Sequence, residues 1–346
     1  MKQNLFGLTP QQLKTVVTSL HLPAFTATQL AEWMYKKQVL NFSEMTNISK
    51  QVREKLESEY VVMLIPPTKV QISNDGTKKY LYATQTSKFI EAAYIPDADR
   101  ATLCVSTQIG CKMGCLFCMT GKQGFQGNLT AGEILNQVQS LPEFDKLTNI
   151  VYMGMGEPMD NVEAVLDSIE IMTSDKGYSW SPKRITVSTI GIIPAMITFL
   201  EKSQAHLAVS LHSPFDVERQ EIMPIQSVYP ITQVIAEIRR WDLGRQRRIS
   251  FEYIMFKGVN DTQRHANELV RLLNGIKCRI NLIRFHPIPD TPLEGTSYDG
   301  IVDFQNRLKA KGLTVTIRAS RGEDIFAACG LLSTKELVRK QQETDF

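Results

Sequence analysis

The sequence predicts an α/β protein whose parallel sheet forms a partial barrel. Two observations carry this prediction. First, short β-forming runs alternate with amphipathic helical segments between residues 101 and 318, and repeated β-then-α order is typical of a parallel sheet with right-handed crossovers. Second, about six such units are present, which favours an incomplete (β/α)6 TIM-like barrel over a closed eightfold barrel.

Seven β-type runs are expected, at residues 101–106, 149–153, 184–189, 206–211, 249–255, 279–284 and 314–318. Apolar residues at helical spacing mark the segments between them, as in Ile134, Leu135 and Val138 after the capping box of Thr130 and Glu133. In such a barrel the chemistry gathers at the carboxyl ends of the strands. We therefore expect a barrel core over residues 97–330, followed by a C-terminal tail over residues 331–346.

Residues 1–61 are expected to form a helical domain. Thr9 with Pro10 and Gln12 is a helix-start pattern. Lys36 and Lys37 follow the apolar residues of a second helical segment. Two interpretations stay open for this domain: a packing appendage, or a basic unit that touches a polyanion.

Residues 62–96 change to a β-type pattern. Val70 and Ile72 run into the triplet 74–76, Asn-Asp-Gly, which is a strong hairpin signal. A β-hairpin extension is therefore expected before the barrel. Glu91 lies in this region, and its position alone indicates only a solvated strand residue.

Composition restricts the class of protein. The chain has 346 residues, 43% of them hydrophobic, so it is long enough to bury a large core. Six cysteines are too few for a disulfide scaffold, and no apolar run resembles a signal peptide or a membrane span. We therefore expect a cytoplasmic protein. The net charge of +3 is too small to indicate nucleic-acid binding by itself.

Three thiols form the most specific pattern in the chain. Cys111, Cys115 and Cys118 lie in one short loop, and a cluster held by three cysteines keeps one iron open for another ligand. Two alternatives compete with this interpretation. A structural zinc site normally needs four ligands, and no paired CxxC follows downstream. Buried thiols that only pack as small hydrophobes are the other alternative.

Polar residues and glycines also follow the expected strands. Gly156 and Glu157 come after the second β-run, where glycine permits close backbone approach to a ligand. The remaining candidates at strand ends are Ser188, Ser210, Leu211, His212 and His286. Each is weak alone, because a strand-end serine is often a turn former and a lone histidine is often a core residue. Their shared position makes them candidates for binding a carboxylate or a ribose.

Two further groups keep open interpretations. The arginines at positions 239, 240, 245, 247 and 248 surround Trp241, as in a solvated face or in a surface that contacts phosphates and stacks on bases. By default Cys104, Cys278 and Cys329 are inert buried thiols.

The chain closely resembles the RlmN family of radical S-adenosylmethionine RNA methyltransferases and its sister family, Cfr. The CxxxCxxC spacing is the signature of radical S-adenosylmethionine enzymes. The resemblance extends over residues 94–330 and includes segment 99–106, the cysteine triplet, and the motifs at 156–158, 188–189, 210–212, 258–261 and 327–330. It implies a partial radical S-adenosylmethionine barrel with an N-terminal helical domain and a β-extension, as the pattern itself predicts.

The resemblance also implies cofactors and residue roles. One 4Fe-4S cluster would be bound by Cys111, Cys115 and Cys118, and its open iron would bind S-adenosylmethionine. Cys329 would take a methyl group from one S-adenosylmethionine, and a radical from a second would activate that methyl for addition to adenine. Cys104 would release the adduct through a transient disulfide, and Glu91 would accept the ring proton.

By the same resemblance, the strand-end candidates contact S-adenosylmethionine: Gly156, Glu157, Ser188, Ser210, Leu211, His212 and His286. Family members often carry asparagine where this chain has His286. A contact through the backbone would tolerate that difference, whereas a side-chain contact would change.

The family implies a substrate and partners. We expect methylation of adenine C2 in 23S ribosomal RNA, before full ribosome assembly, and beside the tRNA anticodon, with flavodoxin or ferredoxin as electron donor and the enzyme as a monomer. Two alternatives remain: Cfr-type methylation of C8, which confers antibiotic resistance, and a non-catalytic iron-sulfur protein that binds RNA and senses redox state. Segment 188–194 and the pair 213–214 lean towards Cfr, while segments 94–101 and 321–324 lean towards RlmN.

Overall fold

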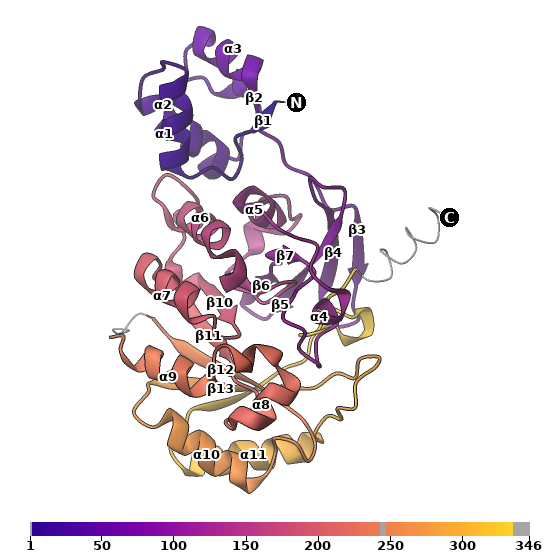
Figure 1. Cartoon of the computed structure of the whole chain (residues 1–346). Helices are drawn as coiled ribbons and strands as arrows, with labels where there is room; N and C mark the ends of the chain where they lie inside the picture. Colours follow the sequence, from indigo (N-terminus) through magenta and orange to yellow (C-terminus); the bar gives the residue numbers. More distant parts are fainter. Residues whose placement is uncertain (1, 243–246, 335–346) are drawn as a thin grey trace.

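A computed structural model describes residues 2–242 and 247–334. Its centre is a ten-stranded sheet with the order β14-β13-β12-β11-β10-β9-β6-β5-β4-β3 (Figure 1). Seven neighbouring strands are parallel, and each matches an expected β-run within two residues: β6 (Arg100–Cys104), β9 (Asn149–Tyr152), β10 (Ile185–Thr189), β11 (His206–Ser210), β12 (Ile249–Met255), β13 (Cys278–Arg284) and β14 (Val315–Arg318).

Helices cover the outer face of the parallel strands (Figure 1). They are α5 (Ala131–Gln139), α6 (Val162–Thr173), α7 (Ile193–Lys202), α8 (Asp216–Ile222), α9 (Ile231–Arg239), α10 (Gln263–Leu273) and α11 (Tyr298–Ala310). Six β–α units therefore precede the last strand, as expected. Strands β14 and β3 end the sheet on opposite edges, so within the described ranges the barrel is open.

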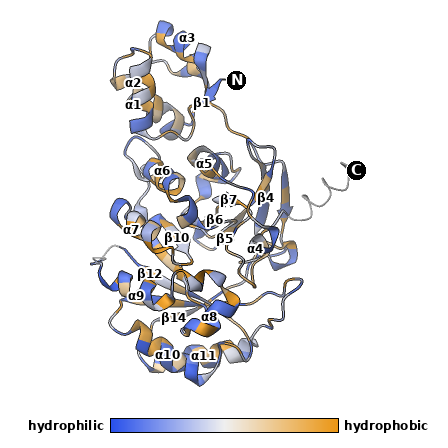
Figure 2. Cartoon of the chain, viewed as in Figure 1, coloured by the Kyte–Doolittle hydropathy of each residue, from blue (hydrophilic) through white to orange (hydrophobic). Residues whose placement is uncertain are grey.

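The strands divide their side chains between two environments. Phe251 and Tyr253 of β12 are fully buried in the main hydrophobic core, whereas Ser250 and Glu252 line a cavity on the opposite face. This alternation follows from the two-residue period of a strand. The helices have the matching amphipathic character, with hydrophobic and hydrophilic residues on different sides (Figure 2). One face of the sheet thus builds the core and the other is left for chemistry.

The expected N-terminal helices are present. They are α1 (Pro10–Ser19), α2 (Phe25–Ala31), a π-helical turn η1 (Glu32–Lys36), a 3-10 turn η2 (Phe42–Glu44) and α3 (Lys50–Glu59), with β1 (Gln3–Asn4) parallel to β2 (Tyr60–Val61). This part lies at one end of the molecule, near α5 and α6 (Figure 1). Gly7, at φ +96°, approaches Gly132 so closely that a Cβ on Gly7 would lie 2.2 Å from the Cα of Gly132.

The β-extension has three strands, one more than a hairpin. Strands β3 (Lys69–Ile72), β4 (Lys78–Ala83) and β5 (Phe89–Asp97) are antiparallel, and β5 pairs with β6, so the extension continues the barrel sheet. The Asn-Asp-Gly triplet forms the expected turn between β3 and β4. None of the helices in the described ranges combines the length and the apolar character that a bilayer span requires.

Candidate active site

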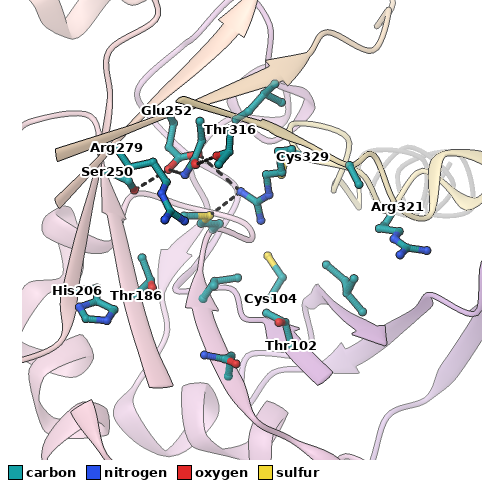
Figure 3. A pocket seen from close by; sticks show the side chains of 18 of the residues that line it. Thr102, Cys104, Thr186, His206, Ser250, Glu252, Arg279, Thr316, Arg321 and Cys329 are labelled. Carbon is teal, nitrogen blue, oxygen red and sulfur yellow. Dashed lines mark hydrogen bonds and ion pairs between the residues drawn. The ribbon is translucent and has the colours of Figure 1, made fainter. Parts of the chain in front are cut away.

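The inner face of the sheet surrounds a cavity of ≈ 570 Å³ (Figure 3). Its walls come from alternate residues of the strands, among them Thr102 and Cys104 of β6 and Glu252 of β12. Because parallel strands end on one edge of the sheet, the loops after β6, β9, β10, β11, β12 and β13 lie at the same end of the barrel. Among these loops, those after β6, β9 and β13 contribute residues to the cavity lining, such as Cys118, Gly154 and His286. All predicted site residues except Glu91 belong to these strands and loops or to the segment after β14.

The loop after β6 carries the cysteine triplet. Cys111 and Cys115 are buried, and Cys118 precedes the short helix α4 (Met119–Gln123). Burial raises the pKa of all three thiols, to about 12 at Cys111. After burial, the charges of Cys118 and Cys111 raise the pKa of Cys115 most, so the three sulfurs lie near one another. Gly110 makes the tight loop possible, since its φ is +71°.

The environment of the triplet is apolar. Within the described residues, no group of three or more His, Cys, Asp or Glu side chains is arranged as a site for a metal ion. In an iron-sulfur cluster each thiolate would bind a different iron, whereas a structural zinc ion takes four ligands. The surrounding apolar residues limit water access, as suits a cluster; they are Met113, Phe117, Ile190, Ile254, Phe256, Ile283 and Phe285.

The second pair of thiols lies at the same cavity. Cys104 is the last residue of β6, and Cys329 follows the 3-10 turn η7 (Glu323–Ile325) near the C-terminus. Both line the cavity (Figure 3). Cys118 lines the same cavity. Burial raises the pKa of Cys104 to about 12, and the charge of Cys329 adds to this rise. The backbone N–H of Met119 donates to the carbonyl of Gly330 at 2.8 Å, which joins the Cys329 segment to the cysteine loop.

The Cys329 segment is also held from the other side, by the turn of the β-extension. Asp75 accepts a hydrogen bond from the N–H of Gly322 at 2.9 Å. Asp324 accepts from the hydroxyl of Ser73 and, at 3.1 Å, from the N–H of Asn74. The β-extension therefore positions Cys329, a role that its sequence did not reveal.

Glu91 lies on β5, outside the cavity lining. In the β5–β6 pair Ala93 is opposite Cys104, so Glu91, two residues earlier, faces the same side of the sheet as Cys104. Its carboxylate is buried, lies 3.2 Å from the ammonium of Lys79 and accepts from the N–H of Ser333 at 3.0 Å. The chain after Cys329 thus covers this carboxylate.

Gly156 and Glu157 follow β9, as expected. Gly156 has φ +98°, and a Cβ there would lie 2.5 Å from the side chain of Gln108, so the position requires glycine. The Glu157 carboxylate accepts from the N–H groups of Met159 at 3.1 Å and Ile190 at 3.0 Å. Burial raises its pKa to about 7 despite these bonds. The side chain of Glu157 therefore joins two strand-end loops.

Ser188 and Ser210 are half-buried on β10 and β11, and Leu211 and His212 follow β11. Burial, with the nearby charge of Arg219, lowers the pKa of His212 to about 3, so its ring is neutral. Its Nδ1 accepts from the N–H of Ile254 at 3.0 Å, which leaves the proton on Nε2. His212 has a left-handed backbone, with φ +54°.

Two buried polar side chains fix this loop: Arg219, which no sequence pattern marked, and Asn260, which belongs to the motif at 258–261. Arg219 of α8 is fully buried and donates to the carbonyls of Ile190, Ser210 and Leu211 at 2.8, 2.9 and 3.1 Å. Asn260 donates to the carbonyl of His212 at 2.7 Å. Because these carbonyls accept hydrogen bonds from Arg219 and Asn260, the loop is held in place for any ligand that contacts it.

His286, after β13, lines the cavity. Its Nε2 lies 3.0 Å from the hydroxyl of Ser320, and its Nδ1 lies 3.2 Å from a carboxylate oxygen of Glu323 without meeting hydrogen-bond geometry. The imidazole thus contacts the segment that leads to Cys329.

The arginine-rich stretch divides into different roles. Arg239 donates to the carbonyls of Leu272 and Asn274, and buried Arg247 donates to that of Leu200. These two arginines are structural, and Trp241 packs partly buried against the core. Arg248 is exposed and lines the cavity. Arg245 lies outside the described residues.

Comparisons with known proteins agree with the geometry. Residues 3–62 match the ribosomal RNA large subunit methyltransferase N-terminal domain, and residues 105–270 match the radical SAM superfamily. The chain is 56% identical to a protein of Parabacteroides distasonis named probable dual-specificity RNA methyltransferase RlmN, over 97% of this chain and 98% of that protein. A protein of Syntrophus aciditrophicus named dual-specificity RNA methyltransferase RlmN is 41% identical, over 97% and 98% of the two chains.

A solved structure supports the same assignment. The crystal structure of a radical SAM methyltransferase from Sphaerobacter thermophilus has a TM-score of 0.87 and 39% sequence identity, and covers 95% of this chain and 99% of that chain. A radical S-adenosylmethionine family implies S-adenosylmethionine and a 4Fe-4S cluster as cofactors. This chain belongs to the RlmN family of radical S-adenosylmethionine RNA methyltransferases.

Proposed function

We propose that this protein methylates C2 of one adenosine in 23S ribosomal RNA and of the adenosine 3′ to the anticodon in tRNA. The observation that carries the proposal is one cavity lined by Cys104, Cys118 and Cys329. Relatives named dual-specificity RNA methyltransferase favour two RNA substrates, and their RlmN name favours C2 over C8.

The reaction needs radical chemistry because an adenine ring carbon has no lone pair that could attack a methyl sulfonium. The cluster and S-adenosylmethionine supply an electron and a 5′-deoxyadenosyl radical that abstracts one hydrogen atom. In our proposal Cys111, Cys115 and Cys118 hold the cluster. S-adenosylmethionine is bound at the strand-end residues Gly156, Glu157, Ser188, Ser210, Leu211, His212 and His286.

Cys329 carries the methyl group in this proposal. Its sulfur takes the methyl as a thioether, and the activated carbon of that thioether bonds to C2 of adenine. After the C2 proton and one electron have left the adduct, where the cluster would take up the electron, the Cys104 thiolate attacks the sulfur of Cys329. This attack forms a disulfide and breaks the bond between that sulfur and the methylene carbon, which takes a proton from solvent as the methylated base leaves. The shared cavity supports this pairing, as does the hydrophobic cluster to which Cys104 and Ala327 both belong.

Glu91 accepts the proton that leaves C2. Its position on the Cys104 side of the sheet supports this role. Because Lys79 and the N–H of Ser333 occupy its carboxylate, the contact with Ser333 must open before Glu91 can reach the base. A carboxylate that is positioned in this way can serve as a general base.

The partners follow from the same proposal. Flavodoxin or ferredoxin donates the electron, and the monomeric enzyme acts in the cytoplasm on 23S ribosomal RNA that is not yet fully assembled. The N-terminal helices contribute to RNA binding. Lys37 supports this role, since it is exposed beside the exposed Lys36 and its ammonium lies 3.5 Å from the centre of the Trp33 ring.

The test is methylation by anaerobically reconstituted protein with a reductant and S-adenosylmethionine. Purified 23S ribosomal RNA and tRNA are supplied separately, and the nucleosides are identified by mass spectrometry against 2-methyladenosine and 8-methyladenosine standards. We expect 5′-deoxyadenosine and 2-methyladenosine. Exclusive 8-methyladenosine would overturn the C2 assignment, and RNA binding without 5′-deoxyadenosine would favour the redox sensor.

A further inference from the structure

One buried carboxylate of the cavity has a role that the reaction steps do not assign. Glu252 of β12 is 4% exposed, and its Oε1 accepts from Ser250 and Asn281, both at 2.8 Å. Thr316 in turn donates to Asn281 at 2.6 Å. These bonds fix the carboxylate on one wall of the cavity, with Cys104 on another (Figure 3).

The second oxygen of Glu252 has no hydrogen bond within the described residues. It lies 3.8 Å from Nη1 of Arg318, which is an ion pair too long for a hydrogen bond. Both side chains line the cavity. A buried carboxylate oxygen without a hydrogen bond is costly, so it marks a place where a ligand donor would be favourable.

Arg318 joins this oxygen to the thiols. Its Nη1 also contacts the sulfur of Met153 at 3.2 Å. The charge of Cys329 is the largest influence on the pKa of Arg318, which it raises, and Cys104 adds to that rise. The wall therefore presents, in order, an acceptor at Glu252, a donor at Arg318 and the sulfur of Cys329.

We infer that Glu252 and Arg318 bind the target adenine, with Oε2 of Glu252 accepting from the N6 amino group and Arg318 donating to N1. This inference rests on the proposed function. The edge of adenine presents a donor at N6, an acceptor at N1 and then C2, and paired contacts of this kind identify a base. The order matches the wall, so C2 comes to the sulfur of Cys329.

The other edge of adenine gives a direct test of the inference. It presents N6, N7 and then C8, which is the same sequence of donor, acceptor and carbon. Contact with N1 therefore belongs with C2 methylation, whereas contact with N7 would belong with C8 methylation. Substitution of single ring atoms distinguishes the two.

The experiment uses a synthetic anticodon stem-loop with adenosine, purine riboside, 1-deazaadenosine or 7-deazaadenosine at the target position. Reconstituted wild-type enzyme, Glu252→Gln and Arg318→Lys are compared by kcat/KM and by the Kd for each RNA. Thr186→Val, at another polar residue of the cavity lining, is the matched control. Comparing each analogue across variants isolates the single contact.

Wild-type enzyme should lose about 10- to 100-fold in kcat/KM on purine riboside and on 1-deazaadenosine, the range for a hydrogen bond to a charged group, and little on 7-deazaadenosine. Glu252→Gln should be insensitive to loss of the amino group, Arg318→Lys should be less sensitive to loss of N1, and Thr186→Val should behave as wild type. Equal discrimination in Glu252→Gln and wild type, or dependence on N7 in place of N1, would overturn the inference. If wild-type enzyme methylates no RNA, the proposed function fails, while the Kd values still test the two contacts.

Discussion

His212 should make the protein less stable in acid. Burial and Arg219 lower its pKa from 6.5 to about 3, so the unfolded state binds a proton that the folded state excludes. The contribution of His212 to stability is therefore fully present above the pKa of this group in the unfolded state. It is lost as the pH falls below that pKa. From about pH 7.5 to about pH 5, this one group removes about 2 kcal/mol from the free energy of unfolding.

His212→Asn tests this reasoning. Asparagine tolerates the left-handed backbone and its side-chain oxygen can replace Nδ1 as the acceptor for Ile254, but it does not titrate. The free energy of unfolding is measured by urea denaturation at both pH values, and the acid loss should shrink by about 2 kcal/mol in the variant. His21→Asn, the same change at an exposed histidine with φ +55°, is the control. An unchanged acid loss in His212→Asn would refute the account of the buried ring.

Three further predictions concern the thiols and Glu91. Cys104→Ala should leave RNA attached covalently to Cys329, so that the protein band is shifted on a denaturing gel and the shift disappears after nuclease treatment. Cys278→Ala should give no such band. Recovery of only free RNA from Cys104→Ala would contradict the resolving role. Cys115→Ser should abolish iron binding in elemental analysis while Cys278→Ser keeps it; zinc in the wild-type protein in place of iron would count against the cluster. Glu91→Gln should lower the methylation rate by about 10²- to 10⁴-fold with little change in RNA affinity, and an unchanged rate would remove Glu91 from the mechanism.

The sequence was sufficient to predict the parallel strands of the sheet because their signals are local. Each parallel strand is a short β-forming run, and the Thr130 capping box starts α5 where expected. The Asn-Asp-Gly turn is likewise where its residues predict it. These features depend on the period and chemistry of neighbouring residues, so no tertiary contact was needed to find them.

Long-range contacts explain what the sequence did not reveal. Arg219 lies on a short helix and would normally face solvent, yet three carbonyls from two strand-end loops surround it. Arg247 resembled part of a basic surface and is buried. Glu252 had one usable signal, because Ser250 and Glu252 are polar at alternate positions of an otherwise apolar strand. That alternation indicated a polar inner face of the sheet.

The central claim is that the methyl group passes through Cys329 as a carbon radical before it reaches adenine. The most direct test supplies S-adenosylmethionine whose methyl group carries three deuterium atoms and measures the mass of the methylated adenosine. Because one deuterium is abstracted and one hydrogen returns from solvent when Cys104 frees the base, the product methyl should retain two deuterium atoms. A product that retains all three would show direct methyl transfer and would contradict the account.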